Sequence, residues 1–283
     1  MDLSGRRQST NVEDRRGNGG KIAGGLGIGG AIIAGLIALL MGGDPSEVVQ
    51  QLATQTGETE AYTPSEQEEQ LKVFATQILA STEDVWSAEF EKMGRTYTPP
   101  KLVLFHGSVQ SGCGNASASV GPFYCSADQC VYLDLDFFNE MPKSIGAGGD
   151  FAYAYVIAHE VGHHVEHLLG ILDQAHAQMS RVSETEKNKL SVRIELLADF
   201  YAGVWGYHEN AMFGSLEEGD LEEAINAAQK IGDDYLQKKA RGYSMPESFT
   251  HGTSAQRIKW LKKGLKSGNM KEGDTFSVAY SSL

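Results

Sequence analysis

The chain has 283 residues, 41% of them hydrophobic and 22% charged, with three cysteines and a formal net charge of −13. This composition is typical of a globular protein with a sizeable core, and it excludes both a disordered chain and a disulfide-built miniprotein. The acidic balance argues against a nucleic-acid-binding protein, because such a protein needs a basic face to neutralise phosphates.

The N-terminal region differs in charge from the rest of the chain. Residues 1–21 carry five basic and three acidic side chains, a net charge of +2, which leaves −15 for residues 22–283. Residues 22–41 contain no charged side chain, and at about 1.5 Å per residue they cross the roughly 30 Å hydrocarbon core of a bilayer. We therefore predict one transmembrane helix at residues 22–41, in which the G-x-x-x-G pair Gly25 and Gly29 permits self-association.

The charges on either side of this segment predict its orientation. Arg15, Arg16 and Lys21 precede the segment, whereas Asp44 and Glu47 follow it. The positive-inside rule then predicts a basic cytoplasmic tail at residues 1–21 and an extracytoplasmic domain anchored in the cell membrane. A cleaved signal peptide and a glycine-rich buried helix of a soluble protein are the alternatives.

The remainder of the chain divides into a tether and one domain. Residues 42–68 are polar and acidic, and we interpret them as a flexible tether. Apolar residues then recur at helical spacing in five segments, residues 69–93, 151–169, 187–206, 216–237 and 254–266. Short strands are predicted at residues 101–105 and 131–135, with loops rich in Gly, Ser and Cys at 111–125. Residues 69–283 are therefore predicted to form an α+β domain, mainly α, with a small strand region.

The predicted helix at residues 151–169 contains the motif His159-Glu160-Val161-Gly162-His163. Two histidines four residues apart lie on one helix face, where both imidazoles can reach a single Zn²⁺. Glu160 lies beside them, where it can take a proton from a water molecule that zinc activates. The less specific interpretation is a pair of histidines on a solvated helix face.

A second, inverted motif overlaps the first. His163, Glu166 and His167 also fit the H-x-x-E-H pattern, and both patterns share His163, so only one can hold a metal. The extended metzincin motif is excluded, because Glu166 and Leu169 stand where that motif needs glycine and histidine.

A pair of acidic residues on the next predicted helix distinguishes the two motifs. Glu195 and Asp199 are four residues apart among apolar neighbours, where a carboxylate is costly unless it is paired or bound to metal. We predict Glu195 as the third zinc ligand and Asp199 as the carboxylate that orients His159 through its other ring nitrogen. The alternative is an ordinary acidic pair on a solvated face.

These motifs carry a family resemblance. The sequences His-Glu-Val-Gly-His-His at 159–164 and Glu-Leu-Leu-Ala-Asp-Phe-Tyr-Ala-Gly at 195–203 resemble the putative neutral zinc metallopeptidase family of bacteria. The similarity extends to residues 6–16, 111–117, 121–125, 131–135 and 248–257. The resemblance implies a zincin-like metallopeptidase domain that uses the His159, Glu160 and His163 motif with a glutamate as third ligand, behind a single membrane anchor. It implies no particular substrate.

A peptidase also needs a group that stabilises the oxyanion of the tetrahedral intermediate. His251 is our candidate, because it lies in a predicted loop before a helix, and Tyr201 and Tyr243 are held in reserve. A capping or core-contact role for His251 is the alternative. His106, His176 and His208 are interpreted as structural or exposed residues without a catalytic role.

The three cysteines form a separate question. In an oxidising compartment Cys113 and Cys125 can form a disulfide, which leaves Cys130 unpaired. Pairing of Cys125 with Cys130 is the alternative, and spacing alone does not decide between them.

The most specific functional hypothesis is a membrane-anchored metallopeptidase that binds one Zn²⁺ and cleaves peptide or protein substrates. The first alternative is a non-catalytic envelope protein that keeps the metal for binding or assembly. Glu160 disfavours it, because a structural metal site needs ligands and no base. The second alternative is a zinc hydrolase of a non-peptide substrate.

Overall fold

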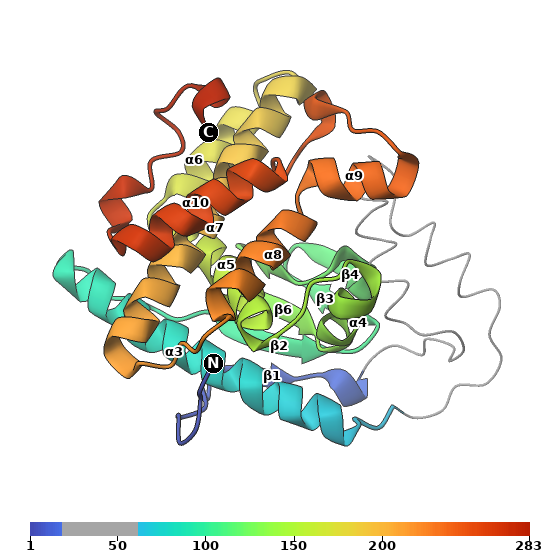
Figure 1. The fold of residues 1–283 in the computed structure, drawn as a ribbon, viewed down its shortest axis with the longest axis vertical. Helices are drawn as coiled ribbons and strands as arrows, with labels where there is room; N and C mark the ends of the chain where they lie inside the picture. The colour runs from blue at the N-terminus through green and yellow to red at the C-terminus, as the bar shows by residue number, and fades with distance from the viewer. Residues whose placement is uncertain (19–61) are drawn as a thin grey trace.

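Helices make up most of the regular secondary structure of the described residues, as the periodicity of the sequence predicts. The computed structural model describes residues 1–18 and 62–283. Its α-helices are α3 (Glu66–Lys92), α4 (Asp136–Ser144), α5 (Asp150–Leu168), α6 (Ile171–Met179), α7 (Glu184–Phe213), α8 (Asp220–Lys230), α9 (Asp233–Arg241) and α10 (Ser254–Ser267). Its strands are β1 (Val12–Asp14), β2 (Lys101–Phe105), β3 (Ser108–Ser111), β4 (Gly114–Ser117), β5 (Phe123–Cys125) and β6 (Cys130–Asp134). The predicted α+β class with small sheets is confirmed (Figure 1).

The main sheet has four strands in the order β1-β2-β6-β5. Strands β1, β2 and β6 are parallel, and the edge strand β5 is antiparallel to β6. Strand β6 is buried at every residue, which explains the apolar runs in the two central strands. Strands β3 and β4 form a separate antiparallel pair, of which β4 lies within the loop region predicted at residues 111–125 and β3 ends where that region begins.

Local signals explain most helix boundaries. Ser65 and Glu68 form a capping box, so α3 begins at Glu66, inside the region predicted as tether. The single helix predicted at 216–237 is wrong, because the chain breaks at Gly232 into α8 and α9. The short helices α4 and α6 were not predicted; α6 follows directly on Gly170, whose φ of 76° ends the preceding helix.

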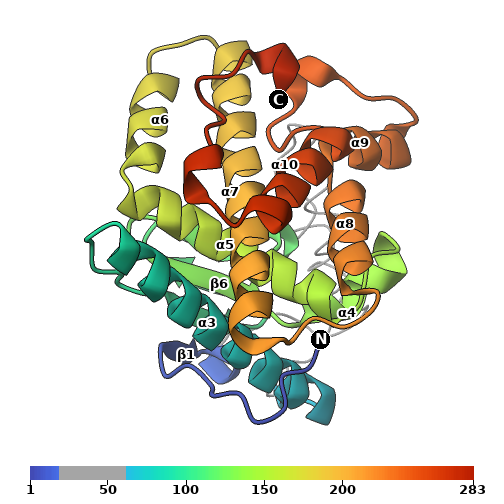
Figure 2. The same ribbon diagram turned by 60° about the vertical axis from the view of Figure 1, so that its left-hand side comes forward.

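Glycines allow the three helices of the site region to approach closely. A Cβ on Gly162 of α5 would lie 3.0 Å from the carbonyl oxygen of Ala198 on α7. Gly203 of α7 and Gly264 of α10 face each other, and a Cβ on either would collide with the backbone of the other helix. Figure 2 shows α10 crossing α7 with α5 beneath them. This packing brings polar side chains of all three helices to one point.

The N-terminal residues are part of the folded domain, which corrects the prediction of a separate tail at residues 1–21. Strand β1 pairs with β2, with Val12 opposite Leu102 (Figure 1). Arg6 forms an ion pair with the buried Glu209 at 2.7 Å, 203 residues away along the chain. Because residues 1–18 lie in the same folded body as residues 62–283, a topology that places them on opposite sides of a bilayer is incompatible with this strand pairing.

The predicted membrane segment lies outside the described residues. Residues 22–41, with Gly25 and Gly29, and the tether up to residue 61 fall in the range 19–61 that the structure does not describe. In the ranges 1–18 and 62–283 none of the helices combines the length and the apolar character that a membrane crossing requires.

Candidate metal centre

Helix α5 presents His159 and His163 on one face, as their spacing predicts. Their ring centroids lie 4.8 Å apart, with the rings nearly perpendicular. The side chains are 8% and 12% exposed, so both imidazoles are largely withdrawn from water. This close approach of two largely buried imidazoles indicates that they bind one ligand together, and it argues against two independent histidines on a solvated face.

Glu195 reaches these two histidines from α7. Its Oε2 lies 3.2 Å from His159 Nε2, and its Oε1 lies 3.6 Å from His163 Nε2. The three ligand atoms all lie within 4.8 Å of one another. Two imidazole nitrogens and one carboxylate oxygen are the donor set of catalytic zinc sites that keep a fourth position open.

The opposite nitrogen of each imidazole is held by a second carboxylate. His159 Nδ1 donates to Asp199 Oδ1 at 2.9 Å, and His163 Nδ1 donates to Glu166 Oε2 at 2.9 Å. These bonds fix both rings with Nε2 directed toward Glu195, the arrangement that zinc-binding histidines usually have. The residues therefore fit a zinc ion.

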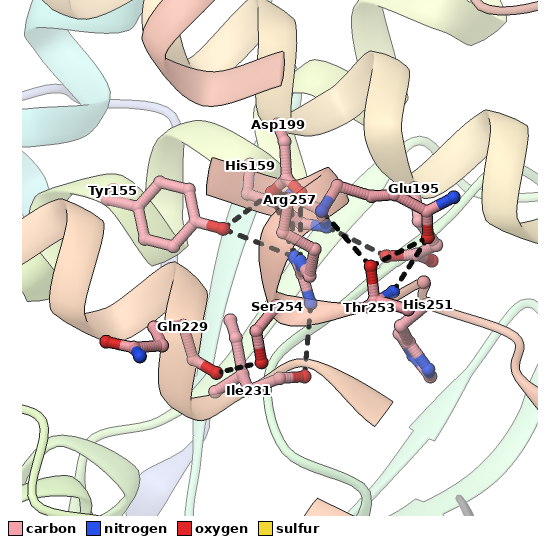
Figure 3. A network of polar contacts seen from close by, with 12 residues as sticks. Tyr155, His159, Glu195, Asp199, Gln229, Ile231, His251, Thr253, Ser254 and Arg257 are labelled. Atoms are coloured by element: carbon pink, nitrogen blue, oxygen red, sulfur yellow. Dashed lines mark hydrogen bonds and ion pairs between the residues drawn. The ribbon is translucent and has the colours of Figure 1, made fainter. Parts of the chain in front are cut away.

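A buried network holds Asp199 in turn (Figure 3). Arg257 of α10 donates to both carboxylate oxygens, from Nε at 2.8 Å and from Nη2 at 2.9 Å. The Tyr155 hydroxyl donates to Asp199 Oδ1 at 2.5 Å and accepts from Arg257 at 3.2 Å. Arg257 and Asp199 are 3% and 0% exposed, so both charges have lost their contact with water. Their hydrogen bonds to each other and to Tyr155 compensate for this loss.

Burial and neighbouring charges act in opposite directions on the pKa values of the ligands. Burial alone would lower the pKa of His159, but Asp199 and Glu195 outweigh it and raise that pKa to about 10. Burial alone would raise the pKa of Glu195, but His251, His163 and His159 hold it well below its ordinary value. The ionised carboxylate of Glu195 therefore favours positive charge at both imidazoles, and a divalent cation bound between them would supply that charge.

Glu160 lines the same cavity as the two histidines and Glu195. The cavity has a volume of about 280 Å³, and its other walls are largely apolar. Burial raises the pKa of Glu160 above its ordinary value. A carboxylate with a raised pKa is suited to accept and return a proton near neutral pH.

His251 lies on the wall of this cavity, on the loop before α10. Asp233 holds that loop, because its Oδ2 accepts the backbone N–H groups of Thr250, His251 and Gly252 at 2.8, 2.7 and 2.9 Å. Burial would lower the pKa of His251, but Glu195 and Asp233 outweigh it and raise it. These neighbours favour the cationic form of the His251 imidazole, and an imidazole N–H at the cavity wall can donate to a developing oxyanion.

The other residues considered from the sequence lie elsewhere. Tyr201 is buried against Trp86 and lines a different cavity, between α6 and α7. Tyr243 is 58% exposed. His167 of the inverted motif lies 3.5 Å from Asp173 and does not line the cavity of His163.

Three residues of the site were missed. Glu166 was considered only as part of the inverted motif, although its position three residues after His163 on one helix suggests contact. Tyr155 lies four residues before His159, and the same helical spacing indicates it. Arg257 carries no such signal, because it reaches Asp199 from a helix 58 residues away.

The structure joins Cys113 to Cys125 by a disulfide, and Cys130 is a buried free cysteine. The disulfide ties the turn between β3 and β4 to the end of β5. Strand β5 and the residues before it line the cavity with Phe123 and Tyr124. The disulfide therefore fixes one wall of the metal centre.

Comparison with known proteins identifies the family of the chain. The family model described as "Putative neutral zinc metallopeptidase" matches residues 1–276. The "Uncharacterized protein YpfJ" of Escherichia coli (strain K12) is 49% identical over 286 residues, covering 98% of this chain and 99% of that protein. The "Uncharacterized protein Rv2575" of Mycobacterium tuberculosis (strain ATCC 25618 / H37Rv) is 42% identical over 193 residues, 65% of this chain and 64% of that protein. No solved structure gives a significant match.

Proposed function

The chain belongs to the putative neutral zinc metallopeptidase family, and from this premise we propose that it is a peptidase whose catalytic zinc ion is held by His159, His163 and Glu195. The observation that carries the proposal is the convergence of three ligand atoms within 4.8 Å. The Nδ1 atoms of both histidines are engaged by carboxylates, which leaves the two Nε2 atoms for the metal.

Zinc bound at this point would polarise the scissile carbonyl and make water acidic enough to ionise near neutral pH. Glu160 takes the proton of the attacking water and delivers it to the leaving amine, a role that its raised pKa supports. His251 donates a hydrogen bond to the oxyanion as it develops. Arg257 and Tyr155 keep Asp199 in place, so that His159 does not rotate during turnover.

The substrate class that fits is a peptide or protein with an apolar side chain near the scissile bond. Phe137, Val156, Ile231 and Leu236 line the cavity beside the ligands. Burial of an apolar side chain against them would contribute about 25 cal/mol per Å² of buried area. This preference favours a peptidase over a hydrolase of small polar compounds.

The disulfide between Cys113 and Cys125 supports a location in an oxidising, extracytoplasmic compartment. Residues 1–18 would share that compartment, because β1 pairs with β2. Membrane attachment through residues 22–41 stays a prediction, and it would have to leave residues 1–18 and 62–283 on the same side of the bilayer.

The test compares wild type with Glu160→Gln, a substitution that keeps the shape of the side chain and removes the base. We expect zinc content to be unchanged and kcat on a mixed peptide library to fall about 10²–10⁴-fold. Glu184→Gln is the matched control, because Glu184 is 74% exposed at the start of α7. A wild-type protein that holds zinc and cleaves no peptide of the library would overturn the proposal and favour a binding protein.

A further inference from the structure

A second group of metal-ligand side chains lies at the carboxyl ends of the parallel strands. His106 directly follows β2, Asp136 begins α4 two residues after β6, and Glu68 lies in the first turn of α3. One ligand atom from each of the three lies within 4.8 Å of the other two. Carboxyl ends of adjacent parallel strands meet at one edge, where α/β sheets commonly bind ligands.

The His106 side chain is 17% exposed, but its Nδ1 atom lacks the hydrogen bond that a buried ring nitrogen normally has. Its Nδ1 is buried, and among the described residues it has no hydrogen-bond partner. The nearest carboxylate oxygen, Asp136 Oδ2, is 3.8 Å away, which is too far for a hydrogen bond. The ring is held in this position by Tyr62, which stacks on it with centroids 3.9 Å apart. A rigid imidazole with a free nitrogen facing a carboxylate points to a ligand between them.

Both carboxylates are oriented by separate partners. The Tyr62 hydroxyl donates to Glu68 Oε1, and the Ser65 backbone N–H donates to Glu68 Oε2 at 2.9 Å. Asn139 donates to Asp136 Oδ1 at 3.3 Å, which leaves Asp136 Oδ2 directed toward His106. Supporting hydrogen bonds of this kind hold metal ligands in place, as they do at the first centre.

The local charge also favours a cation. Within the described ranges, no lysine or arginine forms an ion pair with Glu68, Asp134 or Asp136. The nearby cation Arg16 is neutralised by Asp14 and Glu69, at 2.7 and 2.6 Å.

The pKa values are consistent with this charge balance. Burial, and the like charge of Glu68, raise the pKa of Asp136, whereas burial lowers the pKa of His106 and favours its neutral form. A neutral imidazole is the form that binds metal.

We propose that Glu68, His106 and Asp136 form a second, structural site for a divalent transition-metal ion of the Zn²⁺ type. One imidazole and two carboxylates suit such an ion, and two carboxylates neutralise its charge. The site would link α3, the end of β2 and the start of α4. Phe137, the residue after Asp136, lines the cavity of the first centre, so the second ion would stiffen that wall.

The experiment counts zinc in the full chain after chelator stripping, reloading with Zn²⁺ and dialysis, by elemental analysis. Wild type is expected to retain two equivalents, and His106→Asn and His159→Asn one each. Glu68→Gln is the second variant at the new site, and circular dichroism confirms that each variant is folded. His176→Asn is the matched control, because His176 is exposed on α6 and should keep both equivalents.

The outcomes separate this inference from the proposed function. One equivalent in wild type that His159→Asn removes, or two equivalents retained by folded His106→Asn and Glu68→Gln, overturns the second site. One equivalent that His106→Asn removes and His159→Asn does not supports the second site and overturns the proposed catalytic centre.

Discussion

The metal centre and the N-terminal segment at residues 1–18 show how differently two parts of one fold depend on sequence. At the metal centre, the spacing of residues within α5 and within α7 already places the ligands on common helix faces. In the N-terminal segment, the partners that attach it to the domain lie far along the chain, such as Glu209 for Arg6 and β2 for β1. Chemistry that depends on spacing within a helix is visible in a sequence, whereas strand addition and long-range ion pairs are not.

The largest effect on stability is expected at Arg257, because the metal centre depends on its long-range contact with Asp199. Arg257→Ala leaves the buried charge of Asp199 without its partner, and breaking such a pair costs about 3–5 kcal/mol. We expect that loss in the free energy of unfolding, measured by urea denaturation of the metal-free protein. Lys259→Ala, an exposed change on the same helix, should stay within about 0.5 kcal/mol. Equal effects of the two changes would show that the network of Figure 3 is not formed.

The contacts of the N-terminal segment should contribute almost as much to the free energy of unfolding. Arg6→Met leaves the fully buried Glu209 without its cation, and because Arg6 is itself 15% exposed the expected cost is about 2–3 kcal/mol. The same denaturation measurement tests this value. A change within about 0.5 kcal/mol, as for an ordinary surface residue, would mean that the segment is separate from the domain, as the sequence had suggested.

The next effect concerns the carboxylate that holds His163. Glu166→Leu removes the acceptor for His163 Nδ1, and the zinc dissociation constant should rise about 10–100-fold. Competition with a chelator of known affinity measures it. If Glu166 were instead the base of the inverted motif, zinc affinity would be unaffected and only kcat would fall.

The smallest effect is a dependence on pH in the N-terminal segment. The hydrogen bond from Arg16 lowers the pKa of Asp14, against the effect of burial, and Lys72 adds to the lowering. A lowered pKa in the folded state stabilises the protein above the ordinary value near 4, and this contribution is lost as the pH falls through the folded-state pKa. Asp14→Asn should therefore lower Tm at pH 7, and the difference from wild type should shrink below about pH 4. If the difference in Tm between Asp14→Asn and wild type were constant with pH, the ionised carboxylate of Asp14 would not be the source of this stability.

The helical part of the fold was largely predictable, and the sheet was predictable only in part. Periodic apolar residues predict α5, α7 and α10, the alternation of apolar and polar residues at 131–135 predicts β6, and the short apolar run at 101–105 predicts β2. Strand β1 was missed because Val12–Asp14 has three residues with two acidic side chains, and only its partner β2 makes it a strand. Gly232 ended a helix that periodicity alone would have continued.

For the metal centre, prediction reached the ligands and Asp199, whose spacing within two helices is informative, but it missed Tyr155 and Glu166, whose spacing is also helical. The structure brings together His159, His163, Glu195 and Asp199 as expected from their spacing in two helices. Arg257 was not assigned a role, because its approach to Asp199 depends on the close contact of α10 with α7 at Gly203 and Gly264. Charge alone also misled the interpretation of residues 1–21, because Arg6, Arg7 and Arg16 pair with acidic residues of the domain.

Anomalous X-ray diffraction at the zinc absorption edge, on crystals of the full chain grown with Zn²⁺, tests the central claim most directly. The account predicts a peak about 2.0–2.2 Å from His159 Nε2, His163 Nε2 and a carboxylate oxygen of Glu195. A peak coordinated by His163 and His167 instead, or the absence of a peak between His159 and Glu195, would contradict it.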